Sequence, residues 1–414
     1  MEVTNAVAMV CGAIVTLRGL GSLLLASVSK GLLRGASHRP GTLATFVGHP
    51  VSAPLSLPED LAALLTEFSA RGPLQFHPLP ATADWDATFR SLAYQPVGYS
   101  GSHVGYQHTY FAEFSAAYQR LDCLLFWQGR PVGLWPLSLR VASSGLAGLS
   151  SQCNGQPGIV PPLLPAELPD RVRKGAARQW LGLVAQLARL RNVAQLEFVA
   201  PAGAAALESW HRLLLEHGAA TTVRVQARID LSLAEAEYHA GLRKSFKALI
   251  NSARREWSAT LDQSGDPSAF AEFEAFHMEV AGRRTRSAAS WADQFSAICD
   301  GSAYAIYLRD PAGRLVGASL INCSRDEALY AIGAYDRQLF DKPLAHLSLA
   351  EAIACARRRG LRRFILGDRP YPGSLPPPSD KELTIGYFKE GFASELVLVP
   401  YLTLTADCLG TLAG

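Results

Sequence analysis

The sequence lacks the short motifs that would assign it to several large enzyme classes. It contains no GxSxG, HExxH, GxxxxGKS/T or GxGxxG pattern, so nothing in it indicates a serine esterase, a zinc protease, a P-loop or a dinucleotide-binding site. Charged residues make up only 18% of its 414 residues, and the formal net charge is +3. The chain as a whole is therefore not a strongly basic nucleic-acid-binding protein, and any basic site must arise from local clustering.

The chain has an odd number of cysteines, and none of them form a CxxC pair. The seven are Cys11, Cys123, Cys153, Cys299, Cys323, Cys355 and Cys408. Several lie in apolar runs, which indicates buried thiols in a reducing compartment and argues against a disulfide framework or a metal site. Apolar residues make up 49% of the chain, and its length suits two domains of roughly 150–200 residues.

Residues 1–44 lack a long uninterrupted apolar run, although they are rich in small and apolar residues. Arg18 and Lys30 interrupt the stretch from Ala6 to Leu33, whose longest uncharged run is shorter than the roughly 20 residues of a membrane-spanning helix. A signal peptide needs positive charge before its apolar core, where this chain has only Glu2. Three interpretations stay open: a disordered extension or misplaced start, an amphipathic contact with a membrane surface, and a true signal. The rest of the chain has the character of a cytoplasmic protein.

An internal repeat organises the remaining sequence. Residues 124–139 and 306–321 each have the pattern of a strand, a turn and a strand, with the motif Gly-Arg-x-Val-Gly at the turn. The two motifs, Gly129–Gly133 and Gly313–Gly317, are 184 residues apart, from 129 to 313. Glycine supplies the positive φ that hairpin turns require. The sequence therefore predicts two copies of one hairpin.

Each predicted hairpin is followed by a similar helix and strand. The helices are expected at 178–189 and 347–358, and the strands at 194–199 and 362–366. A duplicated hairpin, helix and strand resembles the GNAT acyltransferase fold. We therefore expect a tandem pair of GNAT-like α/β domains, each a mixed central sheet flanked by helices. The expected boundaries are an extension at 1–44, a first domain at 45–232, a second at 233–395, and a C-terminal strand at 396–414 that returns to the first domain.

The second half contains two basic clusters. Residues 238–257 are predicted to form one amphipathic helix whose polar face carries Lys244, Lys247, Asn251, Arg254 and Arg255. A second helix is predicted to begin at Asp266-Pro267, with His277 on its packed face, and it leads to the cluster Arg283, Arg284 and Arg286. For each cluster two interpretations stay open, a grip on phosphates or carboxylates and a solvated surface.

The predicted strand 328–335 leads through the loop 336–346 into a helix. In GNAT enzymes this loop holds the pyrophosphate of coenzyme A with glycine-rich backbone amides at the start of the helix. Here no glycine occurs between Gly333 and Gly360, which argues against ordinary coenzyme A binding in the second domain. At the comparable place the first domain has the segment 154–158, which contains glycines and a proline.

The second half resembles the FemABX family of tRNA-dependent peptidyltransferases and its FemAB-like relatives. The matching pieces, in order, are 242–251, 282–286, Gly333-Ala334-Tyr335-Asp336, Lys342-Pro343-Leu344-Ala345-His346, Leu366-Gly367-Asp368 and Tyr387-Phe388-Lys389-Glu390-Gly391-Phe392. The resemblance covers residues 238–395, and the first half matches only in architecture. No coiled-coil arm of the kind that some members carry interrupts the helices.

The resemblance implies an acyl-transfer site at Phe388 and Lys389. The Lys389 cation would face the tetrahedral oxyanion, and the Phe388 backbone carbonyl would orient the attacking amine. The resemblance and the two basic clusters together suggest these substrate-binding residues: Arg243, Lys244, Lys247, Arg283, Arg284, Arg286, Tyr335, Asp336, Lys342 and Asp368. For Asp368 an orienting role and a role in the loop structure stay open, and for Lys389 so does a plain surface position.

The expected function is therefore an acyltransferase that forms an amide on an amine of a cell-envelope precursor. No bound cofactor or metal is expected, and the co-substrate is either aminoacyl-tRNA or acyl-CoA. The expected partners are a nucleotide- or lipid-linked precursor and, with one of the two donors, tRNA. The alternative is a catalytically inert scaffold with the same fold. The oligomeric state stays open.

Overall fold

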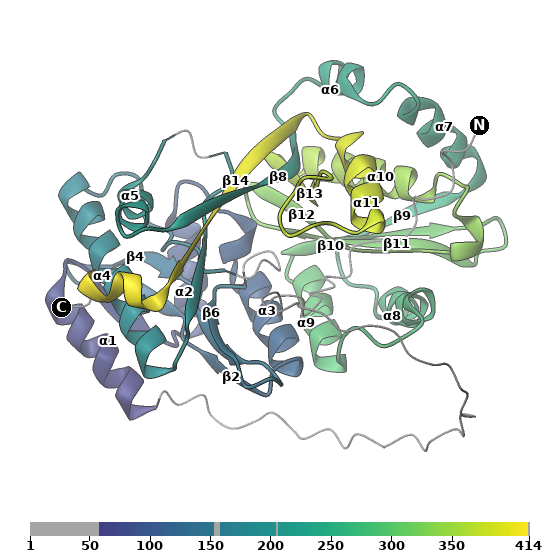
Figure 1. Ribbon diagram of the computed structural model, residues 1–414. Helices are drawn as coiled ribbons and strands as arrows, with labels where there is room; N and C mark the ends of the chain where they lie inside the picture. The colour runs from purple at the N-terminus through teal and green to yellow at the C-terminus, as the bar shows by residue number, and fades with distance from the viewer. Residues whose placement is uncertain (1–57, 153–157, 204–205, 413–414) are drawn as a thin grey trace, which may run out of the picture. The chain divides into compact units, whose positions relative to one another are not determined.

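The computed structural model describes residues 58–152, 158–203 and 206–412, and all of them belong to one compact unit. A second unit, residues 14–56, lies outside the described residues, as do the expected extension 1–44 and most of the loop 154–158. The described chain has a mixed α/β fold, which confirms the expected fold class (Figure 1).

The described chain contains both isolated helices and strands and runs of consecutive strands. The helices are α1 (Glu59–Arg71), α2 (Thr82–Ser91), α3 (Gly101–Glu113), α4 (Asp170–Leu190), α5 (Ser209–Glu216), α6 (Glu235–Gly241), α7 (Phe246–Glu256), α8 (Pro267–Ala281), α9 (Ala288–Cys299), α10 (Leu344–Arg358) and α11 (Asp380–Glu390). Short 3-10 turns are η1 (Val97–Tyr99), η3 (Arg337–Leu339) and η4 (Ala406–Leu412). The strands are β1 (Gln75–Pro78), β2 (Ala117–Arg120), β3 (Cys123–Trp127), β4 (Arg130–Trp135), β5 (Ser138–Val141), β6 (Ala147–Ser150), β7 (Gln195–Val199), β8 (Ala220–Asp230), β9 (Ser258–Asp262), β10 (Ala303–Arg309), β11 (Leu315–Cys323), β12 (Glu327–Tyr335), β13 (Arg363–Asp368) and β14 (Glu395–Thr405).

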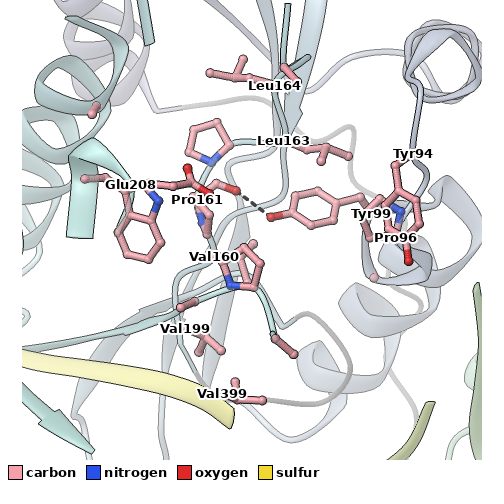
Figure 2. A pocket seen from close by; sticks show the side chains of 18 of the residues that line it. Tyr94, Pro96, Tyr99, Val160, Pro161, Leu163, Leu164, Val199, Glu208 and Val399 are labelled. Atoms are coloured by element: carbon pink, nitrogen blue, oxygen red, sulfur yellow. Dashed lines mark hydrogen bonds between the residues drawn. The ribbon is translucent and has the colours of Figure 1, made fainter. Parts of the chain in front are cut away.

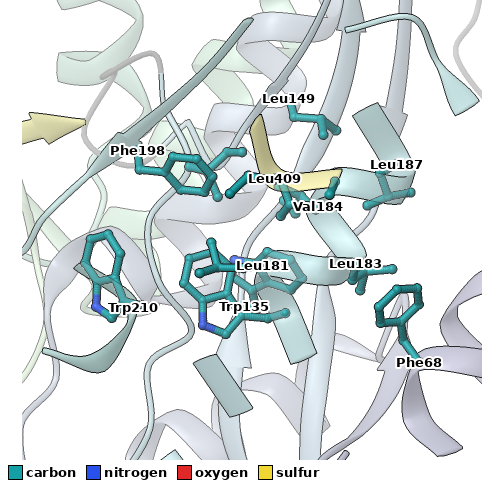
Figure 3. Packing of buried hydrophobic residues seen from close by; sticks show 14 of the residues in the cluster. Phe68, Trp135, Leu149, Leu181, Leu183, Val184, Leu187, Phe198, Trp210 and Leu409 are labelled. Carbon is teal, nitrogen blue, oxygen red and sulfur yellow. The ribbon is translucent and has the colours of Figure 1, made fainter. Parts of the chain in front are cut away.

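The two predicted repeats are present as structural units. The first is the hairpin β3–β4, followed by α4 and β7, and the second is the hairpin β10–β11, followed by α10 and β13. Gly129 and Gly313 have φ of 74° and 83°, as the turn argument requires. In the second half α7 and α10 cover one face of the sheet, while α8 and α9 cover the other. In the first half, aromatic rings pack around α4, as Figure 3 shows for Trp135, Phe198 and Trp210.

The two halves are joined through one continuous sheet. Within the described residues its strand order is β7-β14-β8-β13-β12-β11-β10-β9. β14 of the second half pairs with β7 of the first, β8 of the first half pairs with β13 of the second, and all of these pairings are antiparallel. β8 and β14 also pair with each other, from Glu395–Arg228 to Thr403–Ala220. The last strand therefore returns to the first half, as the sequence predicts, and each half gives its final strand to the other.

The helix predicted over 238–257 is divided in two. α6 ends at Gly241, and Leu242 has an extended conformation with ψ of 145°. This turn lets the Arg243 backbone N–H donate to the Gly391 carbonyl, at 3.0 Å, before α7 begins at Phe246. A single helix was thus wrong, because a backbone contact distant in sequence overrides the helical periodicity. The helix expected after Asp266 is confirmed, and its carboxylate accepts from Ser268 and Ala269 backbone N–H groups.

We expect the shared sheet to make the two halves unfold together. Tyr401 of β14 is 1% exposed, so Tyr401→Ala should lower the free energy of unfolding by about 3–5 kcal/mol. Hydrogen exchange in urea, read by mass spectrometry, should then show peptides from β3 and β11 losing protection at one urea concentration. The exposed residue Thr405 on the same strand provides the control, and Thr405→Ala should change stability by less than about 1 kcal/mol. Separate transitions for the two peptides would contradict the shared sheet.

Candidate functional site

A cavity of about 710 Å³ lies where the two halves share their sheet, and its size is that of a small-molecule site. Its walls come from α4, α5, β7, β8, β13 and β14, and from the segments 94–99 and 160–166. Figure 2 shows the side chains that line it. Both halves therefore contribute to one cavity.

The cavity begins where two parallel segments of the first half separate. Ile159 forms a parallel bridge with Phe198 of β7, whereas Leu163 already pairs with Leu134 of β4. Between and beyond these points the chain has Pro161, Pro162 and Pro165. Because proline has no N–H to donate, this segment cannot continue a strand ladder beside β7. The resulting space is bounded by the segment 160–166 on one side and β7 on the other.

Tyr99 connects the segment 160–166 with the opposite wall of the cavity through a hydrogen bond. Its hydroxyl donates a hydrogen bond to the Pro161 carbonyl at 2.7 Å, the dashed line in Figure 2. Apolar side chains surround the contact, among them Val160, Leu163 and Val399. Most of the cavity near these residues is therefore apolar and fixed in shape.

One wall of the cavity is polar and combines residues of both halves. The Tyr94 hydroxyl donates to a carboxylate oxygen of Glu327 at 2.6 Å, and Arg363 donates to the Tyr94 hydroxyl at 3.0 Å. Arg228 is 7% exposed and donates to the Gln226 side-chain oxygen at 2.6 Å. Burial lowers the pKa of Arg228, and the negative charge of Glu327 opposes that shift. Burial raises the pKa of Tyr94, so its hydroxyl stays protonated.

Cations lie at the rim of the cavity. Arg173 and Lys174 project from the first turns of α4, and Arg212 projects from α5; all three are exposed. No side chain caps the N-terminus of α4. Arg173 is ion-paired with Asp170 in the first turn of α4, so Lys174 and Arg212 are the cations at this rim that can attract an anionic ligand group.

Lys389 lies at a different place, on α11. It is 7% exposed, and its ammonium has no hydrogen-bond or ion-pair partner among the described residues. The ammonium lies over Gly367, where an added Cβ would be 2.7 Å from Nζ. Gly367 has φ of 106°, in a region that side chains rarely adopt. The Lys389 side chain is thus mostly covered by the protein, and its ammonium lies close to the strand backbone, where it can contact a bound ligand.

Asp368 connects Lys389 with the cavity through the backbone of β13. Gly367 pairs with Ala227 and Asp368 pairs with Gln226, so their side-chain positions point to opposite faces of the sheet. Asp368 lines the cavity, and Lys389 covers the other face at Gly367. The end of β13 is therefore reached from both faces, by the cavity on one and by α11 on the other.

Phe388 belongs to an aromatic cluster under α11. Its ring lies 5.9 Å from Phe246, 5.0 Å from His346 and 5.5 Å from Phe392, between ring centroids. Its backbone carbonyl accepts the Gly391 N–H at 3.0 Å. Arg243 closes the cluster from outside, because its guanidinium stacks over Tyr387 at 3.7 Å and donates to the Tyr387 carbonyl. The structure thus brings Arg243, Phe388 and Lys389 together.

The arginine cluster after α8 lies elsewhere. Arg283 and Arg284 are exposed, whereas Arg286 is 2% exposed and donates to the Tyr106 hydroxyl at 3.1 Å. Arg286 also lies 3.3 Å from the His277 ring nitrogen. His277 is packed, as the sequence predicts, and burial lowers its pKa to about 4. Within the described residues, Arg286 is thus engaged in packing between α3 and α8.

The remaining predicted residues lie near the end of β12 or on the α6–α7 corner. Tyr335 is buried, with its hydroxyl 3.0 Å from that of Tyr330. Asp336 caps the turn η3 and accepts from Arg314 at 2.8 Å. Lys342, Lys244 and Lys247 are exposed. None of these side chains lines the cavity.

Sequence reasoning missed the polar wall of the cavity. Arg228, Glu327 and Arg363 come from three strands, and Tyr94 comes from a loop more than a hundred residues earlier. No local signal marks Arg228, since it occupies a polar position in the regular alternation of apolar and polar residues from Val223 to Leu231, which is typical of a strand with one solvated face. A charged residue at a buried strand position needs a partner, which is Gln226 here.

The described cysteines are free thiols. Cys123, Cys323 and Cys355 are buried, and Cys299 and Cys408 are exposed. In the part of the chain that the structure describes, no group of His, Cys, Asp and Glu side chains is arranged to hold a metal ion. The same residues include no helix that is both long and apolar enough to cross a bilayer.

Comparison with known proteins gives a likeness of fold. No protein-family model and no curated protein matches the sequence. FemX is similar in structure, with a TM-score of 0.55 and 10% identity over 78% of this chain and 96% of FemX. L-PGS from Bacillus licheniformis has a TM-score of 0.50 and 12% identity over 81% of this chain and 98% of that one. A tandem GNAT protein from the clavulanic acid biosynthesis pathway has a TM-score of 0.46, with 18% identity and coverage of 80% and 98%. The chain thus has a FemX-like fold.

The close approach of Lys389 to Gly367 can be tested by substitution, because position 367 has no room for a side chain. Gly367→Ala should lower the free energy of unfolding by about 1–3 kcal/mol, since φ is 106° and the new Cβ would meet the Lys389 ammonium. Gly373 is the matched control, because it lies in the following loop with no atom within 4 Å of an added Cβ. Urea denaturation measures both variants, and equal stabilities would contradict the close approach of Lys389.

His346 should make stability depend on pH. Burial, reinforced by the Arg243 charge, lowers its pKa from 6.5 to about 4. The unfolded chain therefore binds a proton below about pH 6.5 that the folded protein does not bind until about pH 4, so this residue makes the free energy of unfolding fall as the pH is lowered through that window. His346→Leu should flatten this dependence, whereas the exposed His239 should not matter. Denaturation at several pH values measures the slopes, and an unchanged slope in His346→Leu would contradict the shift.

Proposed function

We propose that this protein is a transferase that forms an amide by moving an acyl or aminoacyl group from an activated carrier onto an amine of a bacterial cell-envelope precursor. The observation that carries the proposal is Lys389, a residue that is 7% exposed and whose ammonium lies directly over the backbone of Gly367. The FemX-like fold supports an architecture suited to this chemistry, and the resemblance of the second half to the FemABX family supports the assignment of Lys389.

An amide-forming transfer needs few catalytic groups. The acyl carbon of an ester or thioester is already activated, and attack by an amine gives a tetrahedral intermediate with a negatively charged oxygen. The intermediate then breaks its C–O or C–S bond, and the carrier leaves as an alcohol or thiol with the proton that the amine gives up. A positioned cation lowers the energy of that oxyanion more than it lowers the energy of the neutral carbonyl. In our proposal the Lys389 ammonium has this role. The Phe388 carbonyl has a second lone pair besides the one that accepts from Gly391, and we assign to it the orientation of the amine.

The cavity is proposed to hold the carrier of the acyl group. Its apolar part suits an acyl or aminoacyl chain, and its rim, with Lys174 and Arg212, suits the phosphate that both candidate carriers contain. Asp368 stands where the cavity meets the end of β13 and would orient the reacting end of the substrate. The transfer would then take place at Gly367 and Asp368, between the cavity and α11.

The donor is proposed to be aminoacyl-tRNA or acyl-CoA, and different features favour each. The loop 336–346 has no glycine, and the Asp336 carboxylate caps the turn η3. Both features favour a donor other than coenzyme A in the second half. The cavity in the first half, beside the start of α4, is compatible with either carrier. A net charge of +3 gives little general attraction for tRNA.

Mass spectrometry of transfer products tests the function. The protein is incubated with amino-sugar nucleotides and peptidoglycan precursors, with acetyl-CoA or with charged tRNA. We expect a product with one donor and a rate about 10²–10³ lower in Lys389→Ala, the usual effect of removing one group that stabilises an oxyanion. The control is Lys381→Ala, an exposed lysine on the same helix, which should keep the full rate.

Each outcome bears on a different part of the proposal. A product that requires only one donor identifies that donor. An unchanged rate in Lys389→Ala would contradict the site but not the reaction. The absence of product with every pair would contradict the transferase and favour a scaffold with the same fold.

A further inference from the structure

An exposed apolar strip runs across the middle of the shared sheet. Val223 of β8 is 45% exposed, and Leu396 and Leu398 of β14 are 43% and 59% exposed. The register pairs Leu396 with Ala227 and Leu398 with Val225, so these side chains all lie on one face. The solvated face of an antiparallel sheet normally carries polar residues, and an exposed aliphatic face on these strands therefore indicates a contact with something else.

The strip is on the same face as Lys389. Ala227 pairs with Leu396 on one side and with Gly367 on the other, and Gly367 is the residue that the Lys389 ammonium covers. Leu396 is therefore two strands from Lys389, about 10 Å across the sheet at the usual spacing. The exposed leucines and the proposed reactive group share one row of the sheet.

Aromatic side chains border the strip on the side of α11. Arg369, whose backbone N–H donates to the Val225 carbonyl at 2.7 Å, lies with its guanidinium 4.2 Å from the Tyr371 ring and 5.9 Å from the Tyr387 ring. The two tyrosines are 37% and 53% exposed. Leu375, in the loop before α11, is 60% exposed. The apolar surface therefore extends from β14 to α11.

Cations stand at the far border of this surface. The Arg243 guanidinium stacks on Tyr387 at 3.7 Å, and it begins the α6–α7 corner. Lys244 and Lys247 on that corner are exposed and have no ion-pair partner among the described residues. Aliphatic side chains, tyrosines and unpaired cations on one surface are the composition of proteins that bind the interface of an anionic bilayer.

We propose that this face binds the surface of an anionic lipid bilayer. The bilayer-binding face is defined as Val223, Leu396 and Leu398 on the sheet, Tyr371, Leu375 and Tyr387 at α11, and Lys244 and Lys247 on the α6–α7 corner. The leucines and tyrosines enter the headgroup region, while the two lysines attract anionic headgroups. If the proposed transferase function holds, an acceptor carried on a lipid would reach Lys389 directly from the bilayer; that step rests on the proposed function, but binding to the bilayer does not.

Charge complementarity favours a bilayer over a second copy of the chain. A second copy of this chain, which has a formal net charge of +3, brings no excess of negative charge to Lys244 and Lys247. An anionic bilayer supplies negative charge over the whole face.

Co-sedimentation of the full chain with lipid vesicles tests the proposal. Vesicles of phosphatidylcholine, with and without phosphatidylglycerol, are mixed with the protein in the absence of any acyl donor or acceptor, so the result does not depend on transfer activity. We expect binding to the anionic vesicles that weakens with added salt. The double variant Leu396→Ser/Leu398→Ser should reduce the partition coefficient by about tenfold or more, because each serine removes apolar surface that would be buried.

Matched variants separate this face from other surfaces. Lys244→Glu/Lys247→Glu should lower binding to anionic vesicles and leave the weak binding to phosphatidylcholine unchanged. Phe114→Ser/Leu146→Ser removes side chains of similar exposure, 46% and 51%, that lie outside this face, and should bind like the unchanged protein.

Three results would overturn the proposal. One is the absence of binding to anionic vesicles. Another is unchanged binding of the double serine variant of β14, which is the result expected if residues 1–57 bind the membrane or cover the strip. The third is a dimer in sedimentation velocity that these substitutions dissociate, because the occupant would then be a second copy of the chain.

Discussion

The antiparallel pairing of β8 with β14 is the contact on which the rest of the structure depends. It runs from Glu395–Arg228 to Thr403–Ala220, and it places the last strand of each half beside a strand of the other. Because of this exchange, Val399 and Tyr401 of the second half line a cavity that opens beside β7 of the first. Neither half alone could form the cavity, so the fold and the candidate site share one structural origin.

The site combines a fixed backbone with a charge that the fold does not neutralise. Gly367 has no side chain and adopts a φ of 106°, which allows the Lys389 ammonium to lie directly over the strand. The aromatic cluster of Phe246, His346, Phe388 and Phe392 holds the end of α11 in position. Burial, reinforced by the Arg243 charge, keeps His346 neutral above about pH 4, so Arg243 is a cation at the edge of this cluster.

Local patterns in the sequence predicted local structure well. They failed where the structure depends on contacts between residues that are far apart in the sequence. The duplicated hairpins follow from Gly129 and Gly313, and α8 follows from the cap at Asp266, because each depends on a few adjacent residues. The break between α6 and α7 depends instead on the Gly391 carbonyl, nearly 150 residues away, which no helical periodicity can register. The cavity escaped prediction for the same reason, since its polar wall joins Tyr94 with Glu327. Motif resemblance singled out Lys389 and Asp368 as candidates, and their roles stay predictions; it could not tell that they stand on opposite faces of β13.

The cavity and Lys389 lie on opposite faces of β13. Strands β12 and β13 pair in parallel only from Glu327–Arg363 to Leu329–Ile365, although both continue further, and a register irregularity follows between Ile365 and Gly367. The backbone from Gly367 onward therefore no longer pairs with β12, although it stays paired with β8, at the point where the cavity ends on one face and Lys389 lies on the other. Two substrates that approach from the two faces would meet at this segment without competing for one entrance. A carrier with phosphates suits the cavity rim, and an acceptor from an apolar surface suits the row that leads from Leu396 through Ala227 to Gly367. The sheet would then act as the partition between donor and acceptor, and its end as the place where the acyl group crosses.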